Sequence, residues 1–328
     1  MTVVAKGESP SQGFECTIED LAALGPNVRR RLLRGRPRSA ASLKDTVTAH
    51  ARARATADVV HLQEWSDWRN VVATAAWPGR YALTVHDPVP HLGDEFGPRY
   101  ERVTRWVRER AALVLTHGST LAEELRARPE VTSPVEVIPH GAPAPEPLRL
   151  PETPSILFFG RIATYKGLDV LLDAMPAVWE DCPQTQLTVA GEGRIPIHPT
   201  LQDRRATVID RHVPESDVRG LFANATVVVL PYIEATQSGV AARAKGFGRP
   251  IVASSVGALP EAVTASSAVL VPPGDSAALA RALGHVVSRP DVAQGMAAAA
   301  AREAEGATWP RVAELSLELF ERHGLLRR

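Results

Sequence analysis

The feature that most constrains the fold is a regular alternation of short apolar runs with stretches of helical periodicity along most of the chain. Almost continuously hydrophobic runs are typical of strands in parallel sheets that helices cover on both faces. Between the runs, the stretch 168–178 has apolar residues every three or four positions, with Asp169 and Asp173 on the opposite side. The sequence therefore predicts an α/β fold. Its expected strands are residues 58–62, 81–85, 112–115, 135–138, 155–159, 186–190, 207–209, 226–230, 250–253 and 268–271.

Chain length and one proline-rich segment predict two domains. The chain has 328 residues, more than one ordinary core accommodates. Segment 141–154, "GAPAPEPLRLPETP", cannot continue a helix or a central strand, so we expect the interdomain linker there. We divide the chain into domains 1–145 and 146–308 and a final helix in 309–328. That helix should begin after Pro310 and use as its apolar set Val312, Leu315, Leu317, Leu319 and Phe320.

Composition excludes several classes of protein. The formal net charge is zero, which argues against a nucleic-acid partner that covers the whole surface. No run of about 18 apolar residues exists, and the N-terminus lacks the apolar core of a signal peptide. Cys16 and Cys182 lie too far apart for a metal or redox motif. We therefore expect a cytoplasmic protein with reduced thiols.

An arginine-rich segment, Arg29–Arg38, stands out in the first 57 residues. We favour a solvated helix face and loop for it. The functional alternative is a patch that meets phosphates, either of an acceptor or of anionic lipids at the inner face of a membrane.

In open parallel sheets, ligands bind beyond the carboxyl ends of the strands, so the segments after the second-half strands are the candidate site. After run 155–159, Gly160 allows a sharp turn, and Arg161 and Lys166 follow. Two cations at a strand end suit a diphosphate, because Arg can bind two oxygens and Lys adds a mobile charge. A lysine at the start of a helix is otherwise electrostatically unfavourable. These residues therefore predict a diphosphate site.

The segment "LPYIEATQSGV" supplies a second part of that site. Ser238, Gly239 and Val240 begin a helix after a buried run, so their N–H groups can bind an anionic oxygen. Glu234 lies on the preceding turn. It is suited either to accept hydrogen bonds from sugar hydroxyls or simply to cap the helix, and spacing leaves both open.

Two further loops face the same region. In "RHVPESDV", Val213 precedes a helix that should start at Pro214 and Glu215. In "TVHDPVPH", His86, Asp87 and His91 end a first-half strand. A buried, hydrogen-bonded histidine is the commoner outcome for such a residue, but two histidines and an acid on one loop favour a functional His86.

Together these segments resemble the family 4 glycosyltransferases and related bacterial polysaccharide and glycolipid enzymes over residues 58–324. Several motifs in the right order make the resemblance specific. The second half carries "FFGRIATYKGLDVLLDA", "TVAGEG", "VVVLPYIEATQSGV", "GFGRPIVASSVGALPEAV" and "VLVPPGD"; the first half carries "DVVHLQE", "LTVHDPVPH" and "VEVIPHGA".

The resemblance implies a GT-B architecture: two Rossmann-like domains that face a cleft, with a final helix that crosses back to the first. The N-terminal domain would bind the acceptor and the C-terminal domain a nucleotide sugar, without a metal or other cofactor.

Site roles also follow from the resemblance. Gly160, Arg161 and Lys166 would meet the diphosphate together with the amides of Ser238, Gly239 and Val240. The Val213 loop would meet the base through its backbone, Glu234 would contact sugar hydroxyls, and His86 would approach the reacting sugar.

Two departures from the family pattern affect these expectations. Many members have a second Glu eight residues after the first, which binds ribose. Here counting from Glu234 gives Ala242, and counting back from Pro250 gives Arg243. We expect Arg243 to be a helix-surface charge; an extra phosphate is the alternative. The N-terminal region is also compressed relative to the family.

We therefore expect a retaining hexosyltransferase, with GDP-mannose as the first donor to test and a saccharide, lipid-linked or small-molecule acceptor. Retention needs no strong protein base, whereas inversion would need one, for which Asp87 is the candidate. A catalytically silent partner subunit that binds nucleotide sugar and a nucleotide-sugar 2-epimerase are the alternatives.

Overall fold

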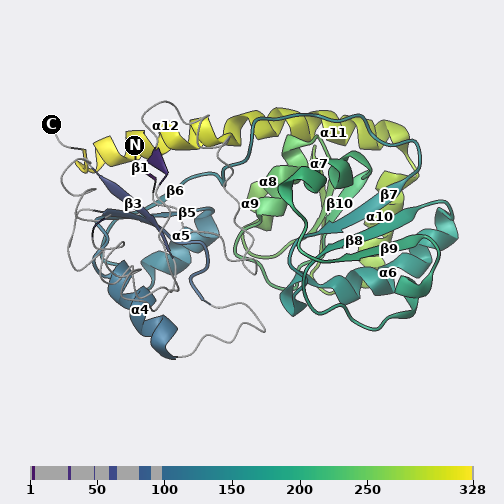
Figure 1. The fold of residues 1–328 in the computed structure, drawn as a ribbon, viewed down its shortest axis with the longest axis horizontal. Coiled ribbons are helices and arrows are strands. Elements are labelled where there is room, and N and C mark those ends of the chain that lie inside the picture. The colour runs from purple at the N-terminus through teal and green to yellow at the C-terminus, as the bar shows by residue number, and fades with distance from the viewer. Residues whose placement is uncertain are drawn as a thin grey trace.

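A computed structural model describes residues 2–3, 29–30, 48, 59–64, 81–89 and 98–326. Two parallel β-sheets with helices packed on them dominate it, one in each half of the molecule (Figure 1). The strands of the first sheet end by residue 137 and those of the second begin at residue 155, on either side of the predicted linker. A separate parallel pair joins β1 (Thr2–Val3) and β2 (Arg29–Arg30). The expected helix face over Arg29–Arg38 is thus wrong for its first two residues, and residues 31–38 lie outside the described part.

The second sheet has six parallel strands in the order β12-β11-β10-β7-β8-β9. If β7 to β12 are numbered 1 to 6, the order read from the β9 edge is 3-2-1-4-5-6, which is that of a doubly wound fold. Neighbouring strands β7 and β10 lead into connections that leave in opposite directions, which places the topological switch point between them. The strands are β7 (Ser155–Phe159), β8 (Gln186–Gly191), β9 (Ala206–Asp210), β10 (Val227–Leu230), β11 (Ile251–Ser254) and β12 (Ala268–Val271).

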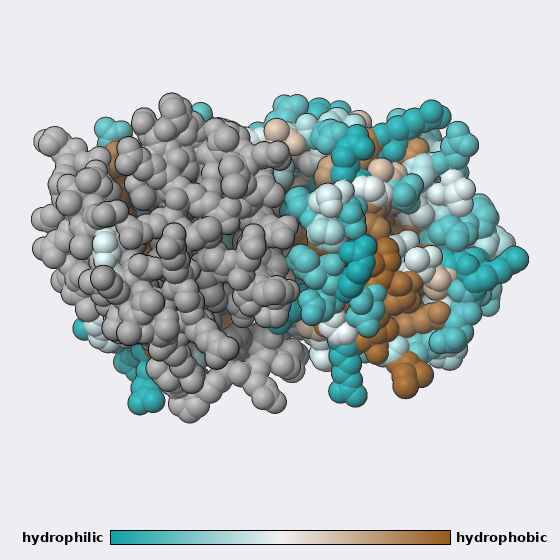
Figure 2. Space-filling model, viewed as in Figure 1, coloured by the Kyte–Doolittle hydropathy of each residue, from teal (hydrophilic) through white to brown (hydrophobic). Residues whose placement is uncertain are grey.

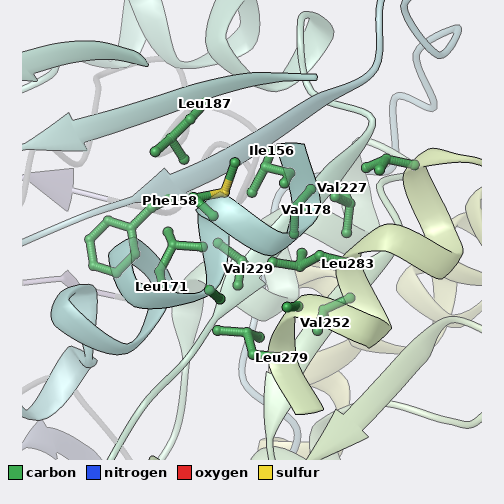
Figure 3. Packing of buried hydrophobic residues seen from close by; sticks show 14 of the residues in the cluster. Ile156, Phe158, Leu171, Val178, Leu187, Val227, Val229, Val252, Leu279 and Leu283 are labelled. Atoms are coloured by element: carbon green, nitrogen blue, oxygen red, sulfur yellow. The ribbon is translucent and has the colours of Figure 1, made fainter. Parts of the chain in front are cut away.

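Helices cover both faces of this sheet. On one face α6 (Leu168–Asp181) and α10 (Ser276–Val287) pack on strand side chains such as Phe158, Val229 and Val252 (Figure 3). The other face meets α7 (Glu215–Ala223), α8 (Gly239–Gly246) and α9 (Leu259–Ala262). Burial on both sides explains why the strands read as continuous apolar runs.

The first sheet has the order β3-β4-β5-β6, all parallel. Helices α4 (Pro98–Arg108) and α5 (Ser119–Arg126) follow β4 and β5 along the chain. Two separate clusters of buried side chains fill its two faces. Its strands are β3 (Val60–Gln63), β4 (Tyr81–Thr84), β5 (Leu113–Thr116) and β6 (Val135–Val137).

The last helices return the chain to the first sheet. Helix α11 (Pro290–Ala304) belongs to the C-terminal half, and α12 (Trp309–Arg322) runs over the N-terminal half (Figure 1). Val312, Leu319 and Phe320 pack against the first sheet, as expected. Leu317 is 52% exposed, so its predicted place in the apolar set is wrong. The buried position is Ser316, whose hydroxyl donates to the Val312 carbonyl.

The proline-rich segment runs as a loop that a buried arginine anchors. The Arg249 side chain is fully buried, and its guanidinium donates to the carbonyls of Leu148 and Arg149 in the loop and of Ala225 in the domain. On the face seen in Figure 2, the C-terminal half exposes a mainly hydrophilic surface crossed by a band of apolar side chains. Among the described residues, no helix combines the length and apolar character needed to cross a membrane.

Candidate functional site

Three segments meet at the switch point of the second sheet. Gly160 follows β7 with a φ of 108°, a left-handed value that favours glycine. A methyl group at this position would lie 3.5 Å from Val240 Cγ2 and 3.7 Å from Lys166 Nζ. The strand end, the ammonium group and the first turn of α8 therefore converge on one point, as the sequence predicts.

Lys166 is a buried cation at this point. It ends a short 3-10 turn (Thr164–Lys166), and its side chain is only 9% exposed. Nζ donates to the Tyr232 hydroxyl at 3.0 Å and lies 4.6 Å from the centre of that ring. Burial alone would lower the pKa of Lys166, but attraction by Tyr232 and Tyr165 outweighs it and raises that pKa. The site thus keeps a positive charge across the physiological pH range.

Tyr232 joins the lysine to the start of α8. Its hydroxyl lies 3.3 Å from Ser238 Oγ, and Ser238 Oγ accepts a hydrogen bond from the Ala241 amide as the N-cap of α8. Capping fixes where the helix begins, and the next amides, of Gly239 and Val240, point out of the first turn. Gly239 is exposed. The helix start therefore offers a positive partial charge beside the lysine.

Arg161 and Glu234 flank this centre on two connected loops. Arg161 is exposed, with its guanidinium carbon 5.7 Å from the centre of the Tyr165 ring. The Tyr165 carbonyl accepts hydrogen bonds from the amides of Ile233, at 2.8 Å, and Glu234, at 3.4 Å. These bonds tie the loop that carries Glu234 to the turn that carries Lys166, and the Glu234 side chain is partly buried.

The loop after β9 carries Val213, which we expected to contact the base through its backbone. The Val213 side chain is buried in the core of the C-terminal half, so only its backbone can face a ligand. Beyond it, Glu215 Oε2 accepts a hydrogen bond from Arg243 Nη1 at 2.8 Å. Arg243 is thus a partly exposed helix charge, as expected, and it forms an ion pair with a carboxylate of α7.

Two residues of the first half contribute to the same region. His86 Nε2 lies 2.8 Å from Gln63 Oε1, at the ends of β4 and β3. Asp87, on the same loop, accepts a hydrogen bond from the Thr236 hydroxyl across the gap between the two halves. The loop after β4 therefore faces the loop after β10, as predicted.

Three of the four described histidines near this edge, His61, His117 and His140, were not among the predicted site residues. His117 and His140 follow β5 and β6, and their ring centres lie 5.0 Å apart; His86 lies 5.0 Å from His117. His61, in β3, is hydrogen-bonded to Thr84. Each of His117 and His140 follows a predicted strand, so the strand-end rule applied to the first half would have found both.

These histidines are uncharged near neutral pH. Burial lowers the pKa of His86 to about 4 and that of His117 to about 3, with mutual repulsion among the rings as a second cause. Burial also lowers the pKa of His140. Among the residues that the structure describes, no group of His, Cys, Asp and Glu is arranged to hold a metal ion.

A second contact between the halves was also missed. Glu261, on α9, accepts hydrogen bonds from the Ser119 amide at 2.5 Å and from the Thr120 amide at 3.0 Å at the start of α5. Partial burial tends to raise the pKa of Glu261. These donors and the Thr120 hydroxyl outweigh burial and lower that pKa to about 2. The halves therefore contact each other around Asp87 and around Glu261.

Comparison with known proteins agrees with this geometry. Residues 153–289 match the family described as "Glycosyl transferases group 1", and residues 1–144 match "Glycosyltransferase Family 4". A glycogen synthase of Mycobacterium tuberculosis is 29% identical over 291 residues, which cover 80% of this chain and 68% of that protein.

A second relative and one solved structure complete the comparison. A GDP-mannose-dependent alpha-(1-6)-phosphatidylinositol dimannoside mannosyltransferase of M. tuberculosis is 33% identical over 163 residues, which cover 47% of this chain and 40% of that protein. Anabaena Alr3699/HepE, solved with UDP-glucose, superposes with a TM-score of 0.68 at 19% identity and covers 91% of this chain and 86% of its own. With two parallel α/β domains and adjoining family matches across both, the chain belongs to the group 1, family 4 type of glycosyltransferases with the GT-B fold.

Proposed function

We propose that this protein transfers a hexose from a nucleoside-diphosphate sugar to a hydroxyl of an acceptor held by the N-terminal half. The observation that supports this best is the convergence of Gly160, Lys166 and the start of α8 at the switch point. A buried ammonium beside exposed helix amides suits a diphosphate, which carries two negative charges in a nucleotide sugar.

Each residue of the site has a role in departure of the leaving group. When the bond to the sugar breaks, negative charge grows on the diphosphate. Lys166, Arg161 and the amides of Ser238, Gly239 and Val240 are fixed donors for that charge, and preorganised donors are usually the largest contribution to catalysis. Since these groups can neutralise the charge themselves, we propose that transfer needs no metal.

The residues that would surround the sugar determine whether transfer retains or inverts its anomeric configuration. Glu234, beside the helix start, would accept hydrogen bonds from sugar hydroxyls, and His86 would face the reacting sugar from the other half. Asp87, the candidate base for inversion, accepts from Thr236. A carboxylate engaged in this bridge is poorly disposed to deprotonate an acceptor, which favours retention of configuration.

The donor and acceptor are open to direct test. The GDP-mannose-dependent relative supports mannose as the first sugar to try, while the UDP-glucose complex makes UDP sugars the necessary comparison. We propose saccharide, lipid-linked or small hydroxyl-bearing acceptors. The arginine-rich segment is a candidate membrane contact, and its arginines beyond Arg30 lie outside the described residues.

The test is to incubate the purified protein with GDP-, UDP- and dTDP-sugars and candidate acceptors, with and without a metal chelator. We expect transfer from one donor class, unchanged by chelation, with a product anomer that keeps the donor's configuration. Arg161→Ala and Lys166→Ala should each lower turnover by roughly a hundredfold.

Three results would contradict the proposal. Full activity in both variants would remove the diphosphate assignment. Nucleotide-sugar binding without transfer or hydrolysis would indicate a silent partner subunit, and exchange of donor epimers would indicate an epimerase.

A further inference from the structure

One imidazole of the N-terminal half reaches the anion-binding end of α8. His140 lies on the loop after β6, and a methyl group at Gly239 would be 3.3 Å from its Cε1 and 3.5 Å from its Nε2. The Cε1–Nε2 edge of the ring therefore faces the first turn of α8. This contact joins a titratable group of one half to the amides that we assign to the diphosphate in the other.

Hydrogen bonding fixes which ring nitrogen carries the proton. His140 Nδ1 lies 2.9 Å from the Gly141 carbonyl oxygen. A carbonyl can only accept, so Nδ1 must be the protonated nitrogen. In the neutral ring Nε2 then presents a lone pair to the start of α8. A lone pair facing a diphosphate would be repelled, whereas an N–H at the same place would donate to it.

Three rings of the described part of the chain face His140, and the Asp87 carboxylate interacts with one of them, that of His86. His117 and His86 face it from the ends of β5 and β4, with ring centres at 5.0 and 6.5 Å, and Trp309 faces it from α12. On the α8 side Lys166 is linked through Tyr232 to Ser238, the residue before Gly239. Burial lowers the pKa of His140, so the ring is neutral until an anion arrives.

We infer that His140 takes up a proton at Nε2 when the donor's diphosphate occupies the start of α8, and then donates a hydrogen bond to it from the N-terminal half. The inference rests on the proposed function. A negative charge within hydrogen-bond distance favours the charged form of a histidine. The proton comes from solvent on binding and returns to it when the nucleoside diphosphate leaves, so His140 would stabilise the departing diphosphate without net proton consumption.

The test is calorimetric titration of the full-length protein at pH 7 with GDP-mannose and with UDP-glucose in buffers of different ionisation enthalpy. The diphosphate of a nucleotide sugar has no group that titrates near neutrality, so any proton taken up belongs to the protein. For whichever donor binds, the enthalpy should change with buffer, showing uptake of up to one proton. Affinity should rise as pH falls, by at most about tenfold per pH unit.

Variants locate the proton. His140→Asn should remove the buffer dependence and weaken binding, with His140→Gln as the second variant if the first does not fold. His285→Asn is the matched control, because His285 is exposed on α10 in the C-terminal half, and it should keep the uptake.

Each other result overturns the inference in a recognisable way. Binding without buffer dependence in the unmodified protein, or uptake that persists without His140, would refute the role of His140 and leave the proposed function intact. Failure of both nucleotide sugars to bind the unmodified protein would refute the diphosphate site itself.

Discussion

At the scale of single residues, Tyr232 determines how the cation of the site is held. Its ring is 2% exposed, and its hydroxyl lies between Lys166 Nζ and Ser238 Oγ, at 3.0 and 3.3 Å. A lysine side chain has many rotamers, and one fixed acceptor selects the rotamer that points at the start of α8. Tyr232 is thus a positioning residue for Lys166.

Tyr232→Phe keeps the ring and removes only this acceptor. A hydrogen bond to a charged group contributes about 1.5–3 kcal/mol, so we expect nucleotide-sugar binding to weaken about tenfold or more. Calorimetric titration measures the affinity, and thermal unfolding reports whether the fold is intact. An intact variant with unchanged affinity would show that Lys166 does not need Tyr232.

At the scale of elements, the sequence pattern located nearly all of the second sheet. Strands β7 and β12 have the predicted bounds, and the other strands of that sheet differ by one residue at one or both ends. Ser238 caps α8 where the motif predicted the helix to start. These features depend on local periodicity and capping, which a sequence shows directly.

Features that depend on packing between elements could not be read in this way. The partner of Arg243 is on α7, and the burial of Ser316 in place of Leu317 depends on the angle at which α12 crosses the first sheet. Neither the direction of the Tyr232 hydroxyl nor the approach of His140 to α8 has a signal in spacing. The candidate diphosphate residues were therefore predictable, but their partners were not.

The histidines at the strand ends of the first sheet predict a sensitivity to acid. Unfolded histidines bind protons near pH 6.5, whereas His86 in the folded chain does so only near pH 4 and His117 near pH 3. The unfolded state therefore binds more protons in that window, and the free energy of unfolding falls as pH decreases from 6.5 towards 4.

Thermal unfolding at pH 7, 6 and 5 measures this dependence. We expect the melting temperature to fall with pH and His117→Asn to flatten the fall, while the exposed-site variant His285→Asn does not. A melting temperature that stays constant from pH 7 to pH 5 would contradict the assignment of uncharged rings.

At the scale of the whole molecule, the two halves are joined by the Asp87–Thr236 and Glu261–α5 contacts and by the return of α12. Gly141 and Trp309 form part of that return, since the Trp309 amide donates to the Ala142 carbonyl at 3.0 Å. A methyl group at Gly141 would overlap the Trp309 ring. The start of α12 therefore packs so closely against Gly141 that the glycine has no room for a side chain.

Gly141→Ala should displace the Trp309 ring; because this ring is 47% exposed and can move into solvent, we expect a cost at the low end of overpacking, about 1 kcal/mol. Hydrogen exchange should show faster exchange in α12. Gly306→Ala is the matched control, because nothing lies within 4 Å of the added methyl group. Equal stability of the two variants would argue against close packing of Trp309 on Gly141.

Glu261→Gln tests the contact between the halves. The ionised Glu261 carboxylate stabilises the contact between the halves at pH values above its unfolded pKa of about 4.5, and this stabilisation is lost as pH falls towards 2. The residue is exposed, so we discount the contact for solvent screening to about 1 kcal/mol at most, a severalfold shift towards an open arrangement. Solution scattering should show a larger radius of gyration. Glu303→Gln, whose carboxylate bonds Thr264 and Ser267 within the C-terminal half, should not change it.

The most direct test of the diphosphate site is the affinity of Lys166→Gln for the nucleotide sugar that binds the unmodified protein best. Lys245→Gln is the control, because Lys245 lies on α8 and bonds the Ala262 carbonyl within the C-terminal half. We predict that Lys166→Gln binds at least about tenfold more weakly while Lys245→Gln binds normally. Equal affinity of a folded Lys166→Gln and the unmodified protein would contradict the assignment of the diphosphate to the switch point.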